Sequence, residues 1–196
     1  MAVAAVCLLF ISTLPRSAPY RIGAARLSGW KLVMEPGGTA FIALQPPPEL
    51  SADLFRQAVQ RTGMALVAPE HPSIPLILQS EYEDSLQGVL STEDVVNLAR
   101  DTGVDTAPFK PVCIARRSDT SSGRPRDLWF AVFESPKFDQ FRLQLSPLFP
   151  EQAGAAPFEP TTLSPVLPIA GTDDGFARWW PIATAPADCL DSVRID

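Results

Sequence analysis

A proline-containing strand pattern occurs twice in this chain and constrains its fold more than any other feature. Pro72-Ser-Ile-Pro-Leu-Ile77 and Pro165-Val-Leu-Pro-Ile-Ala170 share the form Pro-x-apolar-Pro-apolar, and they begin 93 residues apart. Proline has no backbone N–H to donate, so prolines within strands are confined to sheet edges, strand starts and bulges. Each pattern follows a predicted strand–helix unit, 39–63 in the first case and 127–149 in the second. We therefore infer an internal duplication.

The order of the predicted elements indicates an α+β fold. We expect two pseudo-repeated lobes of mostly antiparallel sheet, with helices on the outer faces and a central cleft. Apolar runs and turn residues predict the strands, and helical spacing with capping residues predicts the helices. The strands are expected at 30–34, 39–45, 65–68, 74–78, 108–116, 127–134 and 166–170, and the helices at 51–63, 91–103 and from Ser135 onward.

The chain of 196 residues is long enough for one domain with a substantial core. We expect a signal-like leader and linker at 1–28, a single bilobed domain at 29–182, and a loosely held tail at 183–196. The apolar run from Met1 to Leu14 is shorter than the roughly 20 residues of a membrane span and resembles a signal-peptide core. No Lys or Arg precedes it, so a buried first element or a wrongly chosen start codon are alternatives. Secretion or periplasmic export is favoured, with a cytoplasmic location as the alternative.

Charge and cysteine content limit the partners. A net charge of −6 and a pI near 4.8 argue against a large nucleic-acid footprint, although a small molecule or nucleotide-like ligand is possible. Of the three cysteines, Cys113 and Cys189 either form a disulfide or are two buried thiols, and the thiols are preferred. Their spacing does not resemble a zinc site, so neither a metal nor a cofactor is expected. No transmembrane span is expected.

Four segments resemble the 2H phosphoesterase superfamily, which includes the 2′-5′ RNA ligases and cyclic phosphodiesterases. They are Phe41-Ile-Ala-Leu-Gln-Pro-Pro-Pro-Glu-Leu50, Pro69-Glu70, Leu128-Trp-Phe-Ala-Val-Phe-Glu-Ser-Pro136 and Pro157-Phe-Glu-Pro160. The resemblance spans about residues 39–170. It implies two duplicated lobes, each of which contributes a His-x-Thr/Ser strand to a central groove. In such a pair one imidazole accepts a proton from the nucleophile, and the other donates one to the leaving oxygen.

The resemblance places the two triplets on Ser73-Ile74-Pro75 and Val166-Leu167-Pro168. Both histidines are absent, and proline occupies both hydroxyl positions, Pro75 and Pro168. A shifted alignment gives His71-Pro72-Ser73, but it places proline in the middle and loses the internal repeat. Because the chain has one histidine, a two-histidine mechanism cannot be built within it. We expect a ligand-binding or structural pseudoenzyme.

Other polar residues allow two alternative functions. Glu81, Glu83 and Asp84 follow the first proline strand, and Asp173 and Asp174 follow the second, so a hydrolase with a rebuilt, possibly metal-dependent carboxylate site is one alternative. A solvated turn is the commoner explanation of the first cluster. Arg116 is either a phosphate contact or an edge-strand charge, and His71 either a lone general base or a surface residue. The second alternative is an exported interaction domain unrelated to phosphoesterases.

Overall fold

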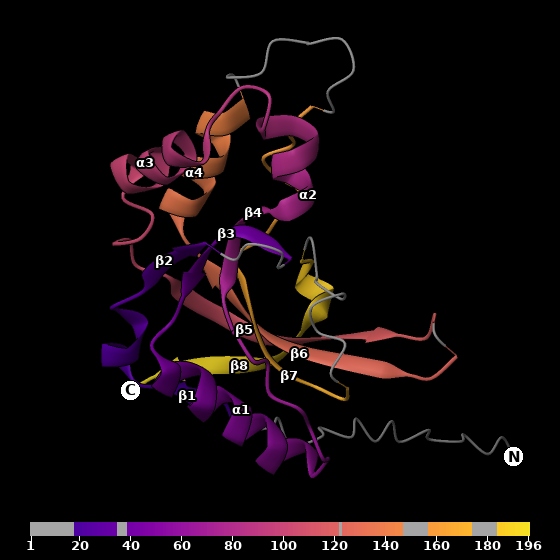
Figure 1. The fold of residues 1–196 in the computed structure, drawn as a ribbon. Coiled ribbons are helices and arrows are strands. Elements are labelled where there is room, and N and C mark those ends of the chain that lie inside the picture. Colours follow the sequence, from indigo (N-terminus) through magenta and orange to yellow (C-terminus); the bar gives the residue numbers. More distant parts are fainter. Residues whose placement is uncertain (1–17, 35–38, 122, 147–156, 174–183) are drawn as a thin grey trace, which may run out of the picture.

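A computed structural model describes residues 18–34, 39–121, 123–146, 157–173 and 184–196, and it has an α+β fold of two sheets (Figure 1). One sheet has five strands in the order β1-β8-β5-β6-β7, and the other has three in the order β2-β3-β4. All strand pairs are antiparallel except β1 with β8. The strands are β1 (Tyr20–Ile22), β2 (Lys31–Met34), β3 (Ala40–Gln45), β4 (Ile74–Leu78), β5 (Lys110–Asp119), β6 (Arg126–Glu134), β7 (Val166–Gly171) and β8 (Cys189–Ile195).

Helices cover the outer sides of both sheets, which confirms the predicted fold class. Figure 1 shows α2, α3 and α4 together beyond the three-stranded sheet and α1 beneath the five-stranded sheet. The helices are α1 (Pro48–Thr62), α2 (Gln79–Glu81), α3 (Thr92–Thr102) and α4 (Pro136–Leu145), with shorter turns η1 (Ala24–Leu27), η2 (Tyr82–Leu86) and η5 (Pro186–Asp188). Helix α1 packs against β1 and β7, so a helix from the first half of the chain covers the sheet of the second half.

Pro75 in β4 and Pro168 in β7 occupy equivalent positions in the two sheets. Strand β4 is the last strand of one sheet and β7 the last of the other. In β4, Pro75 lies opposite Ala43 and the next paired residue is Ile77, so Leu76 is a bulge. In β7, Pro168 lies opposite Phe130 and the next paired residue is Ala170, so Ile169 is a bulge. An edge strand interrupted by a bulge tolerates a residue that cannot donate a ladder hydrogen bond, which explains why both strands accommodate proline.

Local capping signals place the helix ends with one exception. Ser91 caps α3 by accepting a hydrogen bond from the Asp94 N–H, and the Asp94 carboxylate accepts one from the Ser91 N–H in return. Gly63 and Gly103 end α1 and α3 in the left-handed conformation that glycine adopts without strain. The predicted start of α1 at Ser51 is wrong, because Pro48 at the first helical position already has the φ angle of a helix.

Both terminal segments belong to the five-stranded sheet. Strand β8 lies between β1 and β5, so the prediction of a loosely held tail at 183–196 is wrong. Strand β1 lies in the segment assigned to the leader and linker, and the folded body therefore extends beyond 29–182 on both sides. The predicted strand at 65–68 is reduced to one backbone bridge between Val67 and Gly171.

A disulfide joins β5 to the start of β8, which corrects the preference for two buried thiols. The Cα atoms of Cys113 and Cys189 are 5.8 Å apart, within the usual range for a disulfide. Cys113 is buried and Cys189 is exposed. Close by, the guanidinium Nη2 of Arg117 lies 2.6 Å from a carboxylate oxygen of Asp188. Both contacts fix the segment that precedes β8 against β5.

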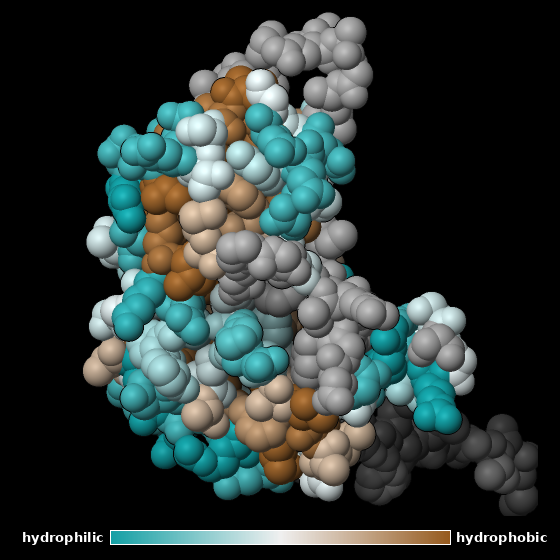
Figure 2. Space-filling view, in the orientation of Figure 1, coloured by the Kyte–Doolittle hydropathy of each residue, from teal (hydrophilic) through white to brown (hydrophobic). Residues whose placement is uncertain are grey.

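Hydrophilic side chains cover much of the face in Figure 2, and its hydrophobic residues lie in separate patches. Large hydrophobic side chains that are exposed, such as Leu143 and Leu190, are scattered over several elements. Among the described residues, no helix combines the length and the apolar composition that crossing a bilayer requires.

Reduction of the disulfide is expected to destabilise the protein. The bridge closes a loop with a sequence separation of 76 residues, and such a cross-link contributes about 2–4 kcal/mol by restricting the unfolded chain. Urea unfolding with and without reductant measures the loss. The Cys113→Ser/Cys189→Ser double variant is the control, because its midpoint should not respond to reductant. Equal midpoints for the oxidised and reduced protein would contradict this expectation.

Candidate functional site

The residues at the degenerate motif positions lie on two strands that contact each other across the lobes. Strands β4 and β7 approach closely, so the structure brings the two proline patterns together. Ser73, Pro75, Val166 and Pro168 are nevertheless all buried, with Ser73 only 3% exposed. No side chain at these four positions carries an imidazole or a carboxylate, so the four positions themselves supply no acid–base pair.

His71 lies on the surface just before β4. Its side chain is 74% exposed, and the imidazole Nε2 lies 3.9 Å from a carboxylate oxygen of Glu70, which is itself 90% exposed. This arrangement matches a solvated surface histidine. The buried hydroxyl-bearing residue Ser73 follows two positions later, at the entrance to β4.

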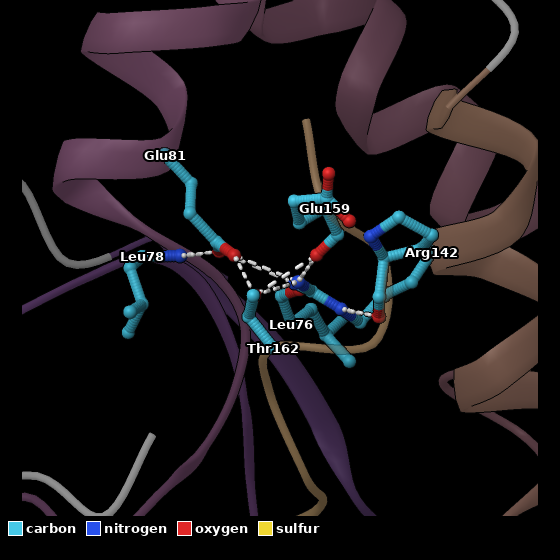
Figure 3. Close-up of polar contacts among 7 residues, drawn as sticks. Leu76, Leu78, Glu81, Arg142, Glu159 and Thr162 are labelled. Atoms are coloured by element: carbon cyan, nitrogen blue, oxygen red, sulfur yellow. Dashed lines mark hydrogen bonds and ion pairs between the residues drawn. The ribbon is translucent and has the colours of Figure 1, made fainter. Parts of the chain in front are cut away.

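Glu81, the first candidate carboxylate, is part of a buried polar cluster (Figure 3). Its Oε1 lies 2.7 Å from Nη2 of Arg142, a residue of α4 whose side chain is completely buried. Its Oε2 accepts a hydrogen bond from the Leu78 N–H at 2.9 Å. Thr162 donates to Oε1 at 3.2 Å. A carboxylate with this many partners has a structural role, since buried charges require pairing and hydrogen bonds.

Arg142 has acceptors for all five of its N–H groups. Nε donates to the Pro160 carbonyl at 2.8 Å, and Nη1 donates to the Leu76 carbonyl at 2.9 Å. Nη2 donates to the Glu159 carbonyl at 3.1 Å, and Glu81 accepts from both terminal nitrogens. Leu76 is the bulge residue of β4, so the guanidinium uses a carbonyl at a position that the strand ladder leaves unpaired. Sequence reasoning missed this residue because an arginine on a helix ordinarily points to solvent.

Of the other predicted binding residues, Glu83 and Asp84 lie on η2, Arg116 on β5 and Asp173 just after β7. Glu83 and Asp84 are exposed on η2, and Glu83 accepts a hydrogen bond from Gln79 at 2.7 Å. Asp173 lies 3.8 Å from the Arg126 guanidinium beside the β5–β6 hairpin. Arg116 is exposed on β5. Asp174 lies outside the described residues. The two acidic segments thus have separate basic partners, Arg142 and Arg126.

Two cavities are lined by residues other than the four motif positions. The first, the arginine cavity, has a volume of about 590 Å³ between α1, β1 and η1. Each of its arginines already lies beside a carboxylate: Arg26 and Arg56 beside Asp53, Arg21 beside Asp196, and Arg61 at 4.0 Å from Asp191. Its positive charge is therefore largely matched.

The second cavity, the α4 cavity, has a volume of about 740 Å³ at the N-terminus of α4. Its walls come from five parts of the chain, namely β5, β6 with the start of α4, the approach to β7, the segment before η5, and Cys189. No single segment carries enough of its lining to be recognised from the sequence. Its acidic residues are Glu134 and Asp139.

Comparisons with protein-family models, with curated proteins and with solved structures give no match to this chain. Within the described ranges, no group of three or more His, Cys, Asp or Glu side chains is arranged to hold a metal ion.

Replacing Glu81 by glutamine is expected to destabilise the protein strongly. The change leaves the buried Arg142 guanidinium without a counter-charge, and breaking such a pair costs about 3–5 kcal/mol. Glu83→Gln, two residues along and exposed, is the matched control and should change stability by less than about 0.5 kcal/mol. Urea unfolding of both variants measures the difference. Similar midpoints for the two variants would show that the cluster has no structural role.

Asp139→Asn is expected to stabilise the protein at neutral pH. Burial raises the pKa of the Asp139 carboxyl above its ordinary value of 3.8, so its ionisation favours the unfolded chain. The gain from the amide should be present at pH 7 and should shrink as the pH falls toward 3.8. Thermal unfolding of both proteins across this range measures it. A gain that is constant with pH, or a loss at pH 7, would contradict the assignment.

Proposed function

We propose that this protein is a 2H-phosphoesterase-like protein that has lost two-histidine catalysis and acts as a non-catalytic binding or structural protein. One observation carries the proposal. The two proline strands are equivalent residue by residue, since each is the edge strand of its sheet and each has a bulge directly after its second proline. Such equivalence is the result expected of a duplicated strand–helix–strand unit.

The partner strands extend this equivalence. Ile74 lies opposite Leu44, and Leu167 lies opposite Ala131, one position before the proline in both units. In both units the strand that pairs with the proline strand precedes it in the chain and is joined to it through a helix, α1 or α4. Strand β4 contacts β7, and α1 packs against β7, so the two units interlock.

The side chains at the motif positions argue for binding or structure over catalysis. A proline cannot hold a phosphate oxygen through a hydroxyl, and the buried Val166 cannot exchange a proton. A carboxylate-based hydrolase is less well supported, because Glu81 is committed to Arg142 and Asp173 lies beside Arg126.

Purified protein is expected to show no turnover of 2′,3′-cyclic nucleotides above the buffer blank. A two-histidine phosphodiesterase assayed in parallel provides the positive control, and release of the ring-opened nucleotide is the readout. The His71→Ala variant should be indistinguishable from the parent. Turnover that His71→Ala or Ser73→Ala abolishes would overturn the proposal, and turnover that Glu83→Gln or Asp173→Asn abolishes would favour the carboxylate-based hydrolase instead.

A further inference from the structure

Strand β8 is held in the five-stranded sheet with little help from its side chains. None of its seven residues is buried, and Leu190 and Ile195 are 54% and 47% exposed. Strand β1, its neighbour, is different, because Tyr20 and Ile22 are only 1% and 2% exposed. Burial of apolar side chains is the main force that holds a strand in a folded sheet. Strand β8 makes almost no use of it.

Covalent and polar contacts hold β8 against β5 instead. The disulfide joins Cys189, the first residue of β8, to Cys113 of β5. Asp188 of the preceding turn η5 forms an ion pair with Arg117 of β5. The β5–β8 ladder itself has three paired positions and is interrupted by a register shift. The disulfide is therefore the strongest single link between these two strands.

Strand β1 has a second anchor that does not involve β8. The side-chain amide of Gln57 in α1 donates to the Arg21 carbonyl and accepts from the Arg21 N–H, both at 2.8 Å. The central carbon of the Arg61 guanidinium, also in α1, lies 3.9 Å from the ring centroid of Tyr20. These contacts and the burial of its side chains keep β1 on α1, so β8 can leave the sheet without unfolding it.

The two halves of the disulfide differ in accessibility. Cys189 is exposed and lines the α4 cavity. Cys113 is 5% exposed and lies in a small apolar cluster that includes Phe130 and Val166, both completely buried. The rate of thiol–disulfide exchange depends on access to the sulfur that is attacked. An external thiolate is therefore expected to attack the sulfur of Cys189.

We propose that the Cys113–Cys189 disulfide is a redox switch that keeps β8 docked when oxidised and releases it when reduced. A dithiol reductant supplies the electrons. One of its thiolates attacks the Cys189 sulfur, the S–S bond breaks, and Cys113 leaves and takes up a proton. The second thiolate of the reductant attacks the mixed disulfide and closes a disulfide within the reductant, so that Cys189 is released and takes up a proton in turn.

Release of β8 changes two parts of the surface. Strand β5 loses its partner on one side, so the backbone groups of residues 113–115 become an open sheet edge. The α4 cavity loses the part of its wall that residues 184–186 and Cys189 form. The reduced protein therefore presents a strand edge and a wider cavity that the oxidised protein covers. This inference goes beyond the proposed function and does not rest on it.

Hydrogen exchange of the full chain, measured by mass spectrometry before and after reduction with dithiothreitol, tests the proposal. Amides of β8 are expected to exchange at least about tenfold faster after reduction, while residues 128–132 in the β6–β7 ladder keep their rates. Reoxidation should restore slow exchange. Arg117→Ala is the control, because it removes the neighbouring ion pair and leaves the disulfide, and its oxidised form should protect β8 as the parent does.

Unchanged exchange of β8 after reduction would overturn the proposal. A uniform increase across both sheets would also overturn it, because the whole chain would then unfold in place of one strand. Loss of β8 protection in oxidised Arg117→Ala would assign the docking to the ion pair and not to the disulfide.

Reaction with glutathione, followed by alkylation and peptide mapping, tests the route of attack. Glutathione is expected on Cys189 and the alkyl group on Cys113, and the reverse labelling would contradict the proposed route. Neither measurement depends on nucleotide turnover, so a failure of this inference and a failure of the proposed function are distinguishable.

Discussion

The structure depends on one enclosed charge, the guanidinium of Arg142. It lies where helix α4 of the second unit meets the end of β4 in the first. Five residues from three segments accept its hydrogen bonds, namely Leu76 of β4, Glu81 of α2, and Glu159, Pro160 and Thr162 in the segment before β7 (Figure 3). The Phe158 ring also lies 4.8 Å from its central carbon, a cation–π contact. A buried arginine is tolerable only when all its donors are satisfied, so each partner backbone is held in one position. Loss of Glu81 therefore affects both sheets at once.

The two sheet edges are closed in related but different ways. At β7, Val67 and Gly171 exchange two backbone hydrogen bonds of 2.8 and 3.0 Å. The proline strands are offset by 93 residues, and the same offset makes Pro160 the counterpart of Val67. Proline has no N–H, so Pro160 cannot form the pair of backbone hydrogen bonds that Val67 forms. At β4, Arg142 links the two segments instead, because its Nε donates to Pro160 and its Nη1 to Leu76, a residue near Leu78, the position equivalent to Gly171. At this one position, a side chain thus links the two segments where a backbone bridge links them in the other unit.

Sequence patterns predicted those parts of the fold that depend on local signals. Ser91 with Asp94 predicted the start of α3, and the prolines indicated edge strands, although not their bulges. Strand β8 was missed because its residues are mostly exposed and lack an apolar alternation, so its place depends on pairing with distant strands. The helical form of the segment after β4 was missed because this segment is held by Tyr82 stacking on Phe41, with 3.6 Å between ring centroids, a contact between segments far apart in sequence. The role of Arg142 and the α4 cavity were missed for the same reason, because the partners of Arg142 and the lining of the cavity come from several segments.

The position of β8 has a consequence for the order of assembly. Strand β1 pairs only with β8 among the described strands, and β8 in turn pairs with β5. The β5–β6–β7 part of the sheet can pair independently of these two strands, but β1 has no edge to join until β8 has docked. Tyr20 and Val193, direct neighbours in this ladder, are very far apart along the chain, and such contacts form slowly. During synthesis, Tyr20 to Ile22 would therefore gain their strand partner only after residues 189–195 have emerged, and until then α1 is the element that can cover their two apolar side chains.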